Sequence, residues 1–180
     1  CLELKKGERL YVTTSTLAEP LLKEVYREAV RVGVYVEYQM TFSEQQKIFI
    51  EEADDDQLNH VNPFLKEMMS TYDAYLVIRA PHNLRENQNN DPIKTAHHLQ
   101  ASQIINQIYS ERIADRSLKR CLCQYPTQAS AQEAGMSLEE YEHFVYDACK
   151  LYDENPASSW MQVRKSQQKI VDYLNTCDNI

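Results

Sequence analysis

The fold is decided by residues 10–40, which read LYVTTSTLAEPLLKEVYREAVRVGVYVEYQM. Residues 10–14 and 34–40 are short and rich in β-branched and aromatic side chains, as β-strands are, and the second stretch alternates cleanly. Between them the apolar residues recur at the spacing of one helix face: Ala18, Leu21, Leu22, Val25, Ala29 and Val32. Gly33 is placed to end this helix. The stretch predicts a right-handed β-α-β unit with parallel strands.

The same alternation continues along the chain. Helical patterns extend from about residue 43 to 71, a strand pattern covers 74–80, a long helix begins at Pro92, and a further strand covers 118–125. Beyond residue 125 only helical patterns follow, which predict a C-terminal helical hairpin. The predicted fold class is therefore α/β, a doubly wound, mainly parallel, Rossmann-like sheet of about four or more strands flanked by helices. We expect residues 1–180 to form a single domain.

Helix starts are indicated by a hydroxyl residue followed three positions later by Glu or Gln, the spacing of a capping box. The three pairs are Thr16/Glu19, Ser43/Gln46 and Ser137/Glu140. A polar loop, residues 83–90, connects the third predicted strand to the helix at Pro92.

Composition excludes several classes of function. A net charge of −8 with scattered Lys and Arg argues against nucleic-acid binding. No apolar run approaches the roughly 20 residues of a membrane span, so we expect a soluble protein. The cysteines (Cys1, Cys121, Cys123, Cys149 and Cys177) lack zinc or redox spacing. We interpret them as buried free thiols of a cytoplasmic protein.

The residue Cys1 leaves further hypotheses open. An upstream segment has been removed or the chain was shortened before the domain. Cys1 would also suit an acylated lipoprotein or a hydrolase that uses its N-terminal residue as nucleophile. Each of these alternatives rests on one residue.

Ligands of open parallel sheets bind beyond the carboxyl ends of the strands. This rule points to Ser15, Thr41, residues 79–83 and residues 125–127. The substrate-cleft candidates are Ser15, Arg79, His82, Tyr125 and Thr127. Arg79 with His82 could orient a carboxylate or a water, or Arg79 could pair with one of the many acids. Tyr125-Pro126 could equally be a rigid turn before the next helix.

The sequence contains no recognisable cofactor-binding or catalytic motif. The first strand-helix turn has no glycine, so there is no dinucleotide fingerprint or P-loop. Adjacent His97 and His98 point in different directions on a helix, and Glu139 with His143 lacks further ligands. The acidic run 51–56 lacks the spacing of a calcium loop. We therefore assign no catalytic and no metal-binding residue in this chain.

Residues 125–141, YPTQASAQEAGMSLEEY, and 155–160, NPASSW, resemble the thermophilic metalloprotease family of aminopeptidases, of the aminopeptidase T and aminopeptidase S type. The first strand at residues 6–12, the helix ending at Gly33 and the elements through His82 follow in the same order. The resemblance covers essentially the whole chain but only about half of the family's length.

This resemblance implies the N-terminal domain of a metal-dependent aminopeptidase. In the family a pair of divalent metals, zinc or cobalt, is held by a second domain and activates water against the first peptide bond of a peptide substrate. The implied partners are that C-terminal catalytic domain and a second copy in a homodimer. This chain would supply scaffold and cleft wall and be inactive alone. The alternative is a stand-alone Rossmann-like ligand-binding or protein-interaction module without catalytic activity.

Overall fold

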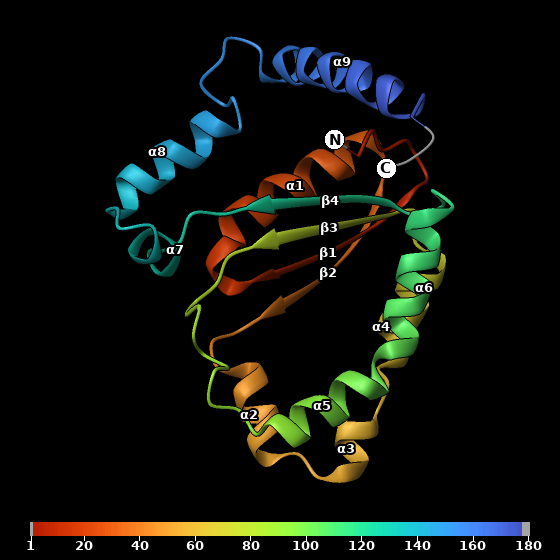
Figure 1. Cartoon of the computed structure of the whole chain (residues 1–180), viewed down its shortest axis with the longest axis vertical. Coiled ribbons are helices and arrows are strands. Elements are labelled where there is room, and N and C mark those ends of the chain that lie inside the picture. The colour runs from red at the N-terminus through yellow and green to blue at the C-terminus, as the bar shows by residue number, and fades with distance from the viewer. Residues whose placement is uncertain (1, 178–180) are drawn as a thin grey trace. The chain divides into compact units, whose positions relative to one another are not determined.

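A computed structural model describes residues 2–177 (Figure 1). The chain divides into two compact units, Cys1–Ser130 and Ala131–Ile180. The first unit contains the sheet. Among the described residues, no helix combines the length and apolar character needed to cross a membrane.

The sheet of the first unit consists of parallel strands β1 (Arg9–Ser15), β2 (Tyr35–Thr41), β3 (Ala74–Arg79) and β4 (Lys119–Gln124). Each lies where the sequence predicts a strand. Their spatial order is β2-β1-β3-β4. β2 lies on one side of β1, whereas β3 and β4 lie on its other side. The direction in which strands are added to the sheet therefore reverses between β1 and β3.

Helices cover both faces of this sheet, which confirms the doubly wound fold. On one face Leu10 and Val12 of β1 and Ile78 of β3 form a core with Leu22 and Ala29 of α1 (Glu19–Val32). The opposite face carries Tyr11, which packs with Met69 of α4 (Pro63–Thr71) and Ile105 of α6 (Gln103–Ala114). Alternation along β1 explains this division, because successive side chains of a strand point to opposite faces.

Two predicted helical stretches are interrupted. Residues 43–71 form α2 (Gln45–Glu52), α3 (Asp55–Asn59) and α4. The helix that begins at Pro92 is α5 (Pro92–Ala101), followed after Ser102 by α6. Asp54 and Asn62 cap α3 and α4 with their side chains, so each starts a new helix.

Only one of the three predicted capping boxes forms. Ser137 and Glu140 make both reciprocal bonds at the start of α8 (Leu138–Ala148). The prediction at Thr16/Glu19 is wrong, because Ser15 caps a short 3-10 helix, η1 (Thr16–Ala18), that precedes α1. The prediction at Ser43/Gln46 is also wrong, because the Ser43 hydroxyl donates instead to Glu86.

Gly33 ends α1 in the left-handed conformation, with φ of 84°. A Cβ at this position would also lie 2.9 Å from Cγ of Lys6. We expect Gly33→Ala to lower the free energy of unfolding by about 1–2 kcal/mol, because an L-residue is strained at positive φ. Urea denaturation measures the change. Gly7→Ala is the matched control for the contact with Lys6, since Gly7 has φ of 90°, and therefore similar backbone strain, with no atom within 4 Å of the added Cβ. An unchanged midpoint for Gly33→Ala would contradict the role of Gly33.

In the second unit, α8 is followed by α9 (Pro156–Leu174). The Trp160 indole donates a hydrogen bond of 2.9 Å to the carbonyl of Cys149 between them. The chain enters this unit within α7 (Gln128–Glu133). The helix α9 has no buried residue, although Met161, Ile170 and Val171 lie on it.

Candidate functional site

A row of polar residues crosses the sheet where its strands end. Arg79 pairs with Gln124 of β4, and Ser15 pairs with Thr41 of β2. Thr13 pairs with Val77, so Ser15 and Arg79, each two residues further on, are level with each other. Because residues at even spacing share a face, this strand-end row (Gln124, Arg79, Ser15, Thr41) faces one side of the sheet, the side of α4 and α6.

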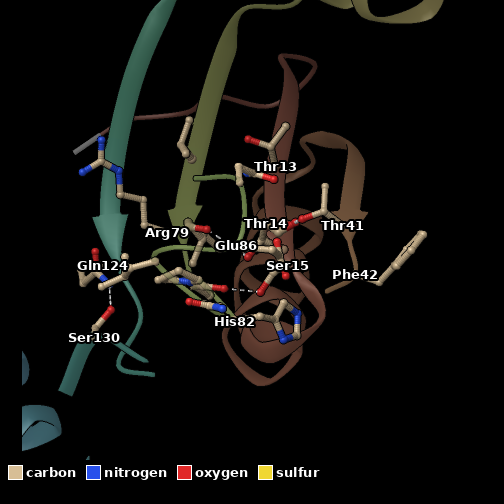
Figure 2. A pocket seen from close by; sticks show the side chains of 17 residues that line it. Thr13, Thr14, Ser15, Thr41, Phe42, Arg79, His82, Glu86, Gln124 and Ser130 are labelled. Atoms are coloured by element: carbon tan, nitrogen blue, oxygen red, sulfur yellow. Dashed lines mark hydrogen bonds between the residues drawn. The ribbon is translucent and has the colours of Figure 1, made fainter. Parts of the chain in front are cut away.

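A cavity of about 540 Å³ lies at the strand-end row. Its walls include Thr13, Val77, Phe42 and residues 80–84 of the chain after β3 (Figure 2). The volume is within the roughly 300–1,000 Å³ of small-molecule sites. This strand-end cavity lies beside the reversal between β1 and β3, where α/β sheets bind ligands.

Ser15 joins the ends of the two central strands. Its hydroxyl donates a hydrogen bond to the carbonyl of Ala80 and accepts one from the Leu17 N–H at 3.2 Å. Ser15 is 7% exposed. The predicted cleft residue therefore borders the cavity but uses its hydroxyl to hold the cavity's floor.

His82 and Thr41 both line this cavity. His82 Nε2 lies 3.1 Å from the Thr16 hydroxyl, which positions the imidazole at the start of η1. The Thr41 hydroxyl donates 3.2 Å to the Thr14 carbonyl. Both side chains are held by the chain around β1 (Figure 2).

Glu86 fixes the loop of residues 83–90 to the start of α2. Its Oε1 accepts hydrogen bonds from the Ser43 hydroxyl at 2.9 Å and from the Glu44 N–H at 2.6 Å. Asn87 adds a bond of 3.1 Å to Gln46. The carboxylate of Glu86 is therefore engaged within the wall of the cavity.

The guanidinium of Arg79 has no hydrogen-bond or ion-pair partner among residues 2–177, so its predicted pairing with an acid is not formed there. The residue is exposed and lines the cavity, and Figure 2 shows its side chain reaching from β3 toward β4. Its carbonyl accepts 2.8 Å from the Tyr125 N–H, which fixes the backbone at this end of β3. The guanidinium carries five N–H donors in a fixed planar arrangement.

Tyr125 and Thr127 do not line this cavity. Tyr125 packs against the core on the α1 face, opposite to its neighbour Gln124. Thr127 is buried, and its hydroxyl accepts 3.3 Å from the Ser130 N–H at the start of α7. This geometry agrees with the interpretation of this segment as a turn that begins a helix.

A second cavity of about 410 Å³ adjoins the first, because both are lined by Thr13 and Thr41. Tyr75 borders it, and its hydroxyl lies 2.9 Å from the Thr13 hydroxyl. Burial raises the pKa of Tyr75 and of its neighbour Tyr11, which stacks on it. These phenols are therefore neutral hydrogen-bonding groups.

No group of three His, Cys, Asp or Glu side chains within residues 2–177 is arranged to hold a metal ion. His98 Nδ1 lies 3.3 Å from the Leu58 carbonyl, and its ring packs on Phe49. His143 packs on Tyr152 at 4.9 Å between ring centroids. The sequence resemblance assigns its pair of metals to a second domain, and the described residues offer no site for them.

The described cysteines are free, as predicted, but they are not fully buried. Cys121, Cys123 and Cys149 are half-buried and Cys177 is exposed. The prediction of buried thiols is wrong for β4, because it is an outer strand with no neighbour on one side to cover Cys121 and Cys123. The hypotheses that rest on Cys1 lie outside the described residues.

Comparison with known proteins identifies the family. The model of the thermophilic metalloproteases (M29) matches residues 1–179. The chain belongs to this family. The M29 chain is also similar in structure to wild-type AmpT from Thermus thermophilus, with a TM-score of 0.75 and 18% sequence identity. The match covers 97% of this chain and 45% of AmpT, so this M29 chain spans less than half the length of that protein. No curated protein matches the sequence.

Proposed function

We propose that this chain is the N-terminal domain of a metal-dependent aminopeptidase that removes N-terminal residues from peptides. The observation that carries the proposal is the M29 family match over residues 1–179. The coverage of 45% of AmpT supports a protein longer than this chain. In this proposal the chain supplies scaffold and a wall of the substrate cleft.

The metal ions belong to the rest of the protein in this proposal. The described residues offer no grouping of three metal-ligating side chains. A pair of divalent ions, zinc or cobalt, would be held by a C-terminal catalytic domain outside residues 1–180. The chain alone is then inactive.

Contacts with further protein surface are part of the same proposal. The helix α9 has no buried residue although it carries Trp160, Ile170 and Val171, which supports coverage by the catalytic domain or by a second copy in a homodimer. The free thiols of the described cysteines support a cytoplasmic location.

Hydrolysis of leucine-p-nitroanilide tests the proposal. We expect no turnover by this 180-residue chain with added zinc or cobalt, and metal-dependent turnover by the full-length product of its gene. The reason is that the described residues lack a metal-binding group. Chelation of the metal in the longer protein is the control. Turnover by the short chain alone would contradict the assignment of the metal site to the rest of the protein.

The second candidate is a stand-alone ligand-binding module. The strand-end cavity favours it, because its floor and walls come entirely from residues 13–130. Failure of both the short chain and the longer protein to hydrolyse peptides would favour this function.

A further inference from the structure

The strand-end cavity differs in charge from the protein as a whole. The chain carries 27 Asp and Glu against 19 Lys and Arg. Among the charged residues that line the cavity, Glu86 is engaged by Ser43 and by the backbone of Glu44. The guanidinium of Arg79 has no hydrogen-bond or ion-pair partner among residues 2–177. The donors to Glu86 are neutral, so the cavity lining carries one carboxylate that is held in the wall and one guanidinium that is not paired with it.

Most other polar groups of the strand-end row are already bonded. The Ser15 and Thr41 hydroxyls donate to the carbonyls of Ala80 and Thr14. The Gln124 amide nitrogen donates to the Ser130 hydroxyl at 3.3 Å. These bonds leave the Arg79 guanidinium as the principal unengaged donor of the row. Within the strand-end row, a ligand would therefore find one planar cation that is not already bonded.

We propose that the strand-end cavity binds a small ligand through a carboxylate group, with Arg79 as its anchor. The fork of N–H groups on a guanidinium matches the two oxygens of a carboxylate. Val77, Phe42 and Leu84 provide apolar wall for the rest of the ligand. The volume of about 540 Å³ suits an amino acid or a short peptide.

A phosphate fits this cavity less well. Phosphate sites at the first turn of α/β sheets use glycines that let backbone N–H groups approach closely. The glycines of this chain, Gly7, Gly33 and Gly135, do not line the cavity. At that turn the Ser15 side chain is present instead, with its hydroxyl bonded across to Ala80.

This inference goes beyond the aminopeptidase proposal and does not depend on it. It concerns binding by residues 13–130 in the absence of metal and of hydrolysis. A binding experiment on the 180-residue chain therefore gives an answer even where peptide hydrolysis fails.

The test is titration of the chain with the tripeptide Leu-Gly-Gly and with its C-terminal amide, followed by calorimetry and by backbone amide NMR. We expect binding of the acid, with shifts at β1, β3 and the loop 81–87, and binding of the amide weaker by roughly ten- to a hundredfold. Arg79→Gln should weaken binding of the acid by a similar factor. Arg79→Lys keeps the charge but lacks the planar fork of donors. Its affinity for the acid should lie between those of the unaltered chain and of Arg79→Gln.

Arg116→Gln is the matched control. Arg116 is exposed, has no side-chain partner in the described part of the chain, and follows α6 at the opposite end of the sheet. The Arg116→Gln variant should bind the tripeptide acid with the affinity of the unaltered chain. Circular dichroism checks that Arg79→Gln is folded, which its exposed side chain allows.

Equal affinity for acid and amide, unchanged affinity of Arg79→Gln, or no binding of either peptide would overturn the proposal. Inorganic phosphate that binds more tightly than the tripeptide, and in an Arg79-dependent manner, would overturn the assignment to a carboxylate.

Discussion

Leu10→Ala is expected to lower the free energy of unfolding of the first unit by about 3–5 kcal/mol, the cost of removing a fully buried leucine side chain. Leu10 is 1% exposed. It lies on β1, which pairs with both β2 and β3, and it belongs to the core under α1. The close surroundings cannot relax far, so the change leaves a void.

Urea denaturation followed by far-UV circular dichroism measures this loss. Trp160 is the single tryptophan and lies in the second unit, so its fluorescence reports separately on that unit. Leu84→Ala is the control, because Leu84 is 51% exposed. A loss below about 1 kcal/mol for Leu10→Ala would show that the β1 core does not determine stability.

Ser15→Ala is expected to cost about 2–3 kcal/mol, because one hydroxyl satisfies two backbone groups. Its removal leaves the carbonyl of buried Ala80 and the N–H of Leu17 without their bonds. The end of β1, the end of β3 and the start of η1 lose a common attachment. The same denaturation experiment measures the effect.

Thr41→Val provides the matched comparison for Ser15→Ala. It removes one hydroxyl bond, from Thr41 to the Thr14 carbonyl, at a less buried position. Its expected cost is about 0.5–1 kcal/mol. Equal losses for the two variants would contradict the bridging role of Ser15.

The strands and their pairing were predictable because local pattern and tertiary position agree. Residues 10–14 and 74–80 are apolar and β-branched, as expected for strands covered on both faces, and they are the central strands β1 and β3. The end of α1 was readable from Gly33, since a left-handed residue is required there.

The failed helix caps show where local pattern is insufficient. Thr16 and Ser43 have the spacing of capping residues, yet their hydroxyls interact with His82 and Glu86, more than 40 residues away. Such long-range bonds carry no signal in a short window of sequence. Ser137 and Glu140 have no such competitor in the described structure and form the predicted box.

The candidate site was predictable in part. The rule for the carboxyl ends of strands located Ser15, Arg79 and His82, which the structure brings to one cavity. It missed Gln124, although the alternation of residues 118–125 places Gln124 and Tyr125 on opposite faces. Glu86 gave no signal, because its contact with Ser43 depends on how the loop folds back.

The strand-end row also affects how this fold can change during evolution. Leu10, Val12 and Ile78 hold the core, while Arg79 and its paired Gln124 lie just beyond it on the opposite face. Substitutions at Arg79 and Gln124 can therefore accumulate without disrupting the sheet, and they can change which ligand the cavity binds. Ser15 is different, because it both joins the ends of β1 and β3 and lines the cavity. It therefore constrains divergence at the centre of the site. Diversification among relatives should then be greatest on either side of Ser15 and least at Ser15 itself.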